Sequence, residues 1–196
     1  SLDILTELDV ICARAYLAQE QHAVRPQMLL KGKVEIRQGR HPLLNKDSVV
    51  PLDVELGERF SMLLITGPNT GGKTVALKAV GLFALMAQSG MFIPASSAKL
   101  PVFRAVYADI GDEQSIEDDL STYSSHLTNM KNMMKNCNAK SLILIDEFGG
   151  GTEPQIGGAI AEAVLKRFNE KLTFGIITTH YQNLKHFAED HEGVVN

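Results

Sequence analysis

The sequence contains few cysteines and no long apolar run. Its two cysteines, Cys12 and Cys137, show neither a pairing motif nor the spacing of metal ligands. This usage suits a reducing cytoplasm, in which both serve as small apolar packing residues. No stretch is apolar enough to cross a bilayer, and no signal peptide is evident. We therefore expect a cytoplasmic protein without a membrane partner.

The sequence also lacks an excess of basic residues. Its formal net charge is −4, from 19 Lys and Arg against 23 Asp and Glu. Modules that grip nucleic acid through its phosphates are usually basic. This stretch of chain is therefore a poor candidate for a DNA-binding surface, although a local basic patch stays open.

Neither end of the sequence has the character of a natural terminus. It begins at Ser1, without an initiator methionine, and ends on the apolar run Gly193–Asn196. We expect a piece of a longer protein.

Alternating helical and extended patterns predict an α/β fold. Apolar positions at helical spacing predict a helix over residues 2–20, and proline and glycine break residues 24–51 into short strands and turns. Short apolar runs predict buried parallel strands at 61–66, 142–145 and 174–178. Helical patterns predict helices at 75–89, 122–136 and 157–169. This alternation predicts one domain with a mainly parallel sheet flanked by helices.

The strongest local signal is a glycine-rich segment after the first of these strands. It matches the pattern G-x-x-x-x-G-K-[ST], a P-loop, with Gly67, Pro68, Asn69, Thr70, Gly71, Gly72, Lys73 and Thr74. Glycines let the backbone wrap around phosphates, and the following helix points its positive end at the same anion. We predict that these eight residues bind ATP with Mg²⁺. Lys73 reaches the β- and γ-phosphates, and the Thr74 hydroxyl holds the metal.

Two acids follow the second predicted strand. Asp146 suits support of Mg²⁺, and Glu147 suits a general base that polarises the attacking water. Alone, the pattern also fits a strand that ends in two solvated acids, but the upstream P-loop favours the catalytic interpretation. The third strand ends at His180, at the edge where ligands bind in such sheets, so we predict contact with the γ-phosphate or its water. Lys73, Glu147 and His180 are the predicted catalytic residues.

A serine-rich segment precedes the predicted 122–136 helix. Ser121 or Thr122 is a natural N-cap after an acidic turn. Hydroxyls at a helix N-terminus also favour an anion, so a phosphate-sensing function stays open beside the capping function.

The order of these motifs resembles the ATP-binding-cassette class of P-loop proteins. Within that class, the residues resemble the ATPase domain of the MutS mismatch-recognition family, most closely its second bacterial branch, many of whose members bear a Smr nuclease domain. The matching segments are Ala108–Glu117, Leu120–His126 and Ile177–Tyr181, with Arg40–Leu43 at the entry to the domain. The resemblance covers nearly the whole chain.

The resemblance implies an ATPase domain at residues 23–196, truncated at its C-terminus, with residues 1–22 as the end of a connector helix. Two such domains pair head to tail as a homodimer, so that Ser121 and Thr122 act in trans on the partner's nucleotide. ATP-driven closure is then coupled to DNA or ribosome binding elsewhere in the longer chain, in control of recombination, mismatch-repair-like processing or ribosome rescue. His41 is a candidate nucleotide contact or a structural His-Pro turn.

Two other functions stay open. One is a cassette ATPase of transport or chromosome-organising type, although Leu120-Ser121-Thr122-Tyr123 departs from the Leu-Ser-Gly-Gly signature usual in transporters. The other is a nucleotide-binding dimerisation module without turnover, against which Glu147 argues. The consecutive glycines 149–151 fit either a flexible or a close-packed crossing between subunits.

Overall fold

The structure, a computed structural model, describes residues 2–67, 72–111, 119–149 and 153–196, without the side chains of residues 119–123 and 154. In chain order its elements are α1 (Leu2–Glu20), β1 (Gln27–Leu29), β2 (Val34–Gly39), β3 (Leu52–Leu56), β4 (Phe60–Thr66), α2 (Lys73–Gln88), β5 (Ser97–Pro101), β6 (Ala105–Asp109), α3 (Asp119–Asn136), β7 (Ser141–Ile145), α4 (Pro154–Glu170), β8 (Phe174–Thr179), α5 (Gln182–Asp190) and β9 (Gly193–Val195). Backbone contacts group the chain into two compact units. The first is Ser1–Glu55 with Leu82–Val102, and the second is Leu56–Gly81 with Phe103–Asn196.

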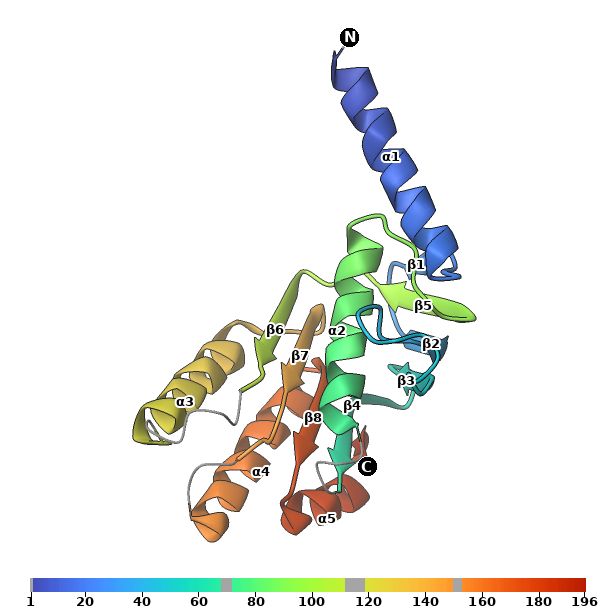
Figure 1. Cartoon of the computed structure of the whole chain (residues 1–196). Coiled ribbons are helices and arrows are strands. Elements are labelled where there is room, and N and C mark those ends of the chain that lie inside the picture. The colour runs from blue at the N-terminus through green and yellow to red at the C-terminus, as the bar shows by residue number, and fades with distance from the viewer. Residues whose placement is uncertain (1, 68–71, 112–118, 150–152) are drawn as a thin grey trace. The chain divides into compact units, whose positions relative to one another are not determined.

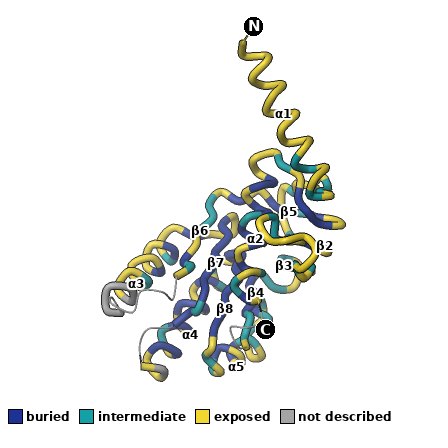
Figure 2. The backbone as a smooth tube through the Cα atoms, in the orientation of Figure 1, coloured by how far each residue is buried: buried dark blue, intermediate teal, exposed yellow. Residues whose placement is uncertain are grey.

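The second unit is built on a parallel sheet of strand order β6-β7-β8-β4-β9. Every neighbouring pair in this sheet is parallel. Strands β7 and β8 are buried along their whole length, as Figure 2 shows, which explains their near-continuous apolar sequence. The three predicted strands are confirmed as β4, β7 and β8, and β8 lies between the other two.

Helices cover both faces of this sheet (Figure 1). Helices α3, α4 and α5 share one hydrophobic cluster with Ile143 and Ile145 of β7. The first half of α2 packs on the other face, where a Cβ added to Gly81 would lie 2.5 Å from Leu144 Cδ1. Alternate residues of β7 therefore point into opposite layers. This arrangement confirms the predicted parallel sheet flanked by helices.

The first unit holds a smaller sheet of order β1-β5-β2-β3. Strand β5 pairs in parallel with β1 and antiparallel with β2. Its core contains buried side chains of β2 and β5, namely Val34, Ile36, Ala98 and Leu100. The second half of α2 also belongs to this unit and ends at Gln88, shortly before Gly90 with its φ of 74°. The helix predicted over residues 75–89 is confirmed, and glycine at position 90 accepts this left-handed conformation at little cost.

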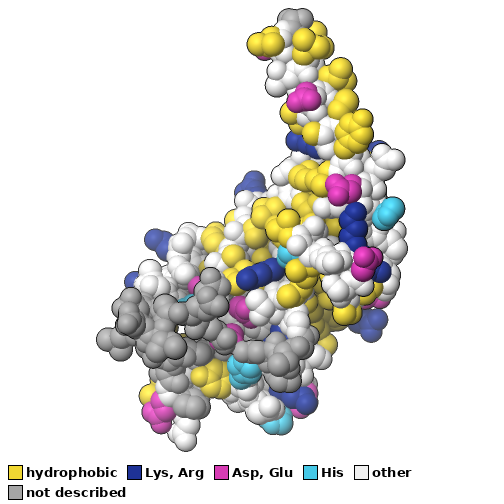
Figure 3. Space-filling model, viewed as in Figure 1, with side chains coloured by type: hydrophobic (Ala, Val, Ile, Leu, Met, Phe, Trp, Pro, Cys, Tyr) yellow, Lys and Arg dark blue, Asp and Glu magenta, His cyan; other side chains and the backbone are white. Residues whose placement is uncertain are grey.

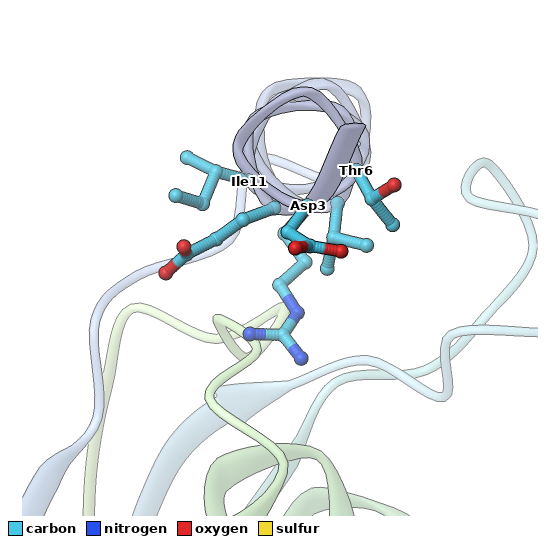
Figure 4. A pocket seen from close by; sticks show the side chains of 6 residues that line it. Asp3, Thr6 and Ile11 are labelled. Atoms are coloured by element: carbon cyan, nitrogen blue, oxygen red, sulfur yellow. The ribbon is translucent and has the colours of Figure 1, made fainter. Parts of the chain in front are cut away.

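Helix α1 has no buried residue, as Figure 2 shows. The space-filling view shows hydrophobic side chains along it (Figure 3), and the large ones that are exposed are Leu2, Ile4, Leu5, Leu8, Val10, Ile11 and Tyr16. A hollow of about 420 Å³ is lined by α1 alone, with Asp3, Thr6 and Ile11 among its residues (Figure 4), and it contains no predicted site residue. The helix is confirmed, and its assignment as the end of a connector stays a prediction. Among the helices that the structure describes, none is both long and apolar enough to cross a membrane.

Candidate nucleotide-binding and hydrolysis site

Three parallel strands bring predicted site residues to one edge of the larger sheet. Register pairs Ile65 of β4 with Thr178 of β8, and Ile145 of β7 with Ile177 of β8. The P-loop follows β4, the acid pair follows β7, and His180 follows β8. The carboxyl ends of parallel strands are where ligands bind in open α/β sheets.

The described part of the P-loop consists of Gly67 and residues 72–74. Gly67 and Gly72 have φ of 135° and 75°, a region that favours glycine. Helix α2 begins at Lys73, and the N–H groups of a first helical turn attract anions. The Lys73 side chain is buried, and its Nζ donates a hydrogen bond to the Gly67 carbonyl. The loop therefore holds a cation beside the start of a helix, as a phosphate site requires.

The two acids differ in exposure and in their partners. Asp146 is 8% exposed, its Oδ1 accepts a hydrogen bond from Thr178 Oγ1, and its N–H donates to the Asp109 carbonyl at 2.9 Å. The Glu147 side chain is 36% exposed, and its N–H donates to Thr178 Oγ1 at 2.8 Å. Asp146 is thus an anchored carboxylate, whereas Glu147 is accessible to water, as a general base must be.

His180 lies beside Glu147 at the same edge. Its Nε2 is 3.6 Å from Glu147 Oε1, and its side chain is 49% exposed. This separation is within ion-pair range when His180 is protonated but too long for a hydrogen bond. The structure therefore brings the predicted base and the predicted γ-phosphate contact together.

A buried acid that was not predicted as a site residue lies at the end of β6. Asp109 is 4% exposed and accepts hydrogen bonds from His126 Nδ1 at 2.7 Å and from Asn129 Nδ2 at 2.9 Å. Both donors belong to α3, the helix whose first turn contains Ser121 and Thr122. Asp109 thus anchors this helix to the sheet. The i, i+3 spacing of His126 and Asn129 places them on one helix face and is the sequence signal that could have revealed the shared partner.

Other predicted residues are less fully described. Part of the P-loop lies outside the described residues, namely Pro68, Asn69, Thr70 and Gly71. Helix α3 begins at Asp119, so Ser121 and Thr122 lie inside its first turn. The predicted N-cap at Ser121 or Thr122 is therefore wrong, because local sequence determines the exact helix boundary poorly. Their side chains also lie outside the described residues, and their function in trans stays a prediction. His41 belongs to the first unit, where its Nδ1 accepts the Leu43 N–H at 3.3 Å, and its contact with nucleotide stays a prediction.

The oxygen donors of the site fit Mg²⁺. This ion prefers oxygen ligands and is usually bound by one or two carboxylates, substrate phosphates and retained waters. Asp146 offers a carboxylate fixed by a hydrogen bond, and Thr74 offers a hydroxyl in the first turn of α2. A metal brought with a nucleotide would find suitable protein ligands in these two residues.

The fold is that of a P-loop ATPase domain of the α/β class, with a parallel sheet flanked by helices. Comparison with family models gives the family, because the model of MutS domain V matches residues 63–196. The chain belongs to the MutS family.

Curated relatives support the predicted second branch of this family. The chain is 50% identical over 197 residues to the endonuclease MutS2 of Geobacillus sp. (strain WCH70), covering 100% of the chain and 25% of that relative. It is 52% identical to the endonuclease MutS2 of Lachnospira eligens, covering 99% and 25%. It is 54% identical to that of Clostridium botulinum (strain Alaska E43), covering 98% and 25%. The chain therefore spans about a quarter of the length of these relatives.

Proposed function

We propose that the chain is the ATP-binding and ATP-hydrolysing domain of a MutS2-type DNA-processing protein. The observation that supports this proposal most strongly is that a cationic side chain, two carboxylates and an imidazole lie at one edge of the sheet. A buried lysine follows β4, a buried and hydrogen-bonded aspartate follows β7, and an accessible glutamate lies 3.6 Å from His180 after β8. Phosphoryl transfer to water needs such a set, because catalysis depends on positioning and on stabilising negative charge.

Each residue has a separate function in this proposal. Lys73 exchanges the Gly67 carbonyl for the β- and γ-phosphate oxygens, while the N–H groups in the first turn of α2 attract the same anion. Thr74 and Asp146 hold Mg²⁺, which when bound neutralises charge on the phosphates. Glu147 accepts a proton from the attacking water, and His180 contacts the γ-phosphate or that water.

We further propose that the functional unit is a homodimer in which Ser121 and Thr122 complete the partner's site. The match of residues 63–196 to MutS domain V supports this idea, because it includes the segment with Ser121 and Thr122, and Asp109 fixes the helix that carries them to its own sheet. The net charge of −4 favours DNA or ribosome contacts in other parts of the longer protein, reached through α1 as a connector. The endonuclease activity named for the relatives would likewise belong to those parts.

Replacement of the proposed base tests the function. We expect Glu147→Gln to bind ATP with Mg²⁺ while its turnover falls by about 10²–10⁴-fold, the usual effect of losing a general base. Glu170→Gln is the matched control, because Glu170 is an exposed acid that pairs with Arg167 at 3.1 Å at the end of α4. Wild-type turnover in Glu147→Gln would remove Glu147 from the mechanism. ATP binding without turnover in the unmodified protein would instead favour a dimerisation module.

Sedimentation tests the homodimer. The Glu147→Gln protein should form a dimer with ATP and Mg²⁺ and dissociate without them. ATP closes the dimer in this proposal, and it stays bound when hydrolysis is blocked. Mixing Lys73→Ala with Ser121→Ala protein should restore turnover when mixed dimers form, because each mixed dimer contains one intact composite site. Mixed dimers that remain inactive would contradict the proposed action in trans.

A further inference from the structure

One buried hydroxyl contacts both predicted acids. Thr178, near the end of β8, is 1% exposed. Its Oγ1 donates a hydrogen bond to Asp146 Oδ1 and accepts the N–H of Glu147 at 2.8 Å. Its carbonyl oxygen also accepts the N–H of Phe148 at 2.8 Å. Thr178 therefore binds three successive residues of the segment that follows β7.

The backbone of Glu147 needs such support. Its φ is 51°, in the left-handed region that few residues other than glycine adopt. A residue in this conformation persists where its surroundings determine it, and such residues gather at functional sites. The hydrogen bond from the Glu147 N–H to Thr178 Oγ1 helps to hold this conformation. Because the backbone sets where a side chain begins, the same bond helps to direct the Glu147 carboxylate.

We propose that Thr178 is a positioning residue for ATP hydrolysis. Its hydroxyl orients the Asp146 carboxylate by donation and the Glu147 backbone by acceptance, so one side chain fixes the metal-supporting acid relative to the general base. This inference rests on the proposed ATPase function. A hydroxyl has one donor and two acceptor positions, so threonine or serine can make both bonds, whereas the similarly shaped valine can make neither.

The same strand offers a matched control. Thr173 immediately precedes β8 and is fully buried, and its Oγ1 has no hydrogen-bond partner among the described residues. Thr173→Val and Thr178→Val therefore make the same substitution at opposite ends of β8. Of these two hydroxyls, that of Thr178 alone contacts the acids. Loss of a hydroxyl that matters for stability alone would change the melting temperature. It would not lower kcat while leaving the ATP affinity unchanged.

The experiment measures kcat, melting temperature and ATP affinity with Mg²⁺ or with EDTA for the unmodified protein and the variants Thr178→Val, Thr178→Ser and Thr173→Val. We expect Thr178→Val to lower kcat by about 10–100-fold, the effect of a misplacement near 1 Å. Its ATP affinity in EDTA should change by less than about threefold, because the P-loop is untouched. The gain in affinity from Mg²⁺ should shrink, because Asp146 loses its anchor. Thr178→Ser should recover kcat to within about fivefold, and Thr173→Val should match the unmodified protein in kcat and in ATP affinity.

The outcomes separate this inference from the proposed function. Unmodified protein that binds ATP without turnover would contradict the ATPase proposal. In that case, a smaller gain in ATP affinity from Mg²⁺ in Thr178→Val would still support the positioning of Asp146 by Thr178, and an equal gain would contradict it. Turnover that is equal in Thr178→Val and the unmodified protein, or equally low in Thr178→Ser and Thr178→Val, would overturn the positioning function. If Thr178→Val does not fold, Thr178→Ser and Thr178→Ala replace the comparison. Serine should then exceed alanine at least about tenfold in kcat, and equal rates would overturn the inference.

Discussion

Replacing Asp109 with alanine should loosen α3, the helix that carries Ser121 and Thr122. The substitution removes both carboxylate oxygens from a side chain that is 4% exposed, while the donors His126 and Asn129 remain. A hydrogen bond to a charged group contributes about 1.5–3 kcal/mol. The His126 side chain is 25% exposed and can turn to water, so its bond counts for less. We therefore expect the free energy of unfolding to fall by about 2–4 kcal/mol.

Urea denaturation measures this loss directly. For a chain of this size, the expected change corresponds to a melting temperature lower by about 4–16 °C. Asp109→Asn should lose less, because it keeps one acceptor oxygen, and a double-mutant cycle with His126→Ala should give a coupling energy above about 0.5 kcal/mol. ATP binding at the P-loop should persist. An alanine variant within about 0.5 kcal/mol of the unmodified protein would refute the anchoring function of Asp109.

Further variants test packing around the site by the same denaturation assay. Gly149→Ala should destabilise the protein by about 1–3 kcal/mol and reduce turnover, because φ is 88° and a Cβ there would lie 2.5 Å from Tyr181 Cε2, and an unchanged stability would contradict this. Thr173→Val should stabilise it by about 1 kcal/mol, because the buried hydroxyl has no partner among the described residues, and a loss of stability would show that it has one. Lys171→Met should cost about 0.5–2 kcal/mol, because Nζ donates to carbonyl oxygens at the end of α3, including that of Cys137 at 3.3 Å, and no change would exclude this capping function.

The larger sheet could be predicted where its strands have runs of large apolar side chains. Strands β4, β7 and β8 have short apolar runs bounded by polar residues, and the structure confirms them. Strand β6 was not predicted, because it is an edge strand with four of its five residues at least partly exposed, and its apolar run Ala105–Ala108 contains no Leu, Ile or Phe. In the first unit, the sequence indicated short strands and turns without their pairing, since pairing between β2 and β5 joins residues about 60 positions apart.

The residues of the candidate site could likewise be predicted from local sequence, but the contacts between distant residues could not. Lys73, Asp146, Glu147 and His180 could be selected because each directly follows a recognisable strand or loop. The contacts of Thr178 with the acids join residues 31 and 32 positions apart, and they depend on the register between β7 and β8. No local spacing encodes that register.

The central claim is that Lys73 and the P-loop bind ATP, and isothermal titration with ATP and Mg²⁺ tests it most directly. Lys78→Ala is the matched control, because Lys78 is an exposed lysine on the same helix. We predict binding by the unmodified protein and by Lys78→Ala, and no measurable binding by Lys73→Ala despite a retained cooperative unfolding transition. Unchanged ATP affinity in Lys73→Ala would contradict the account.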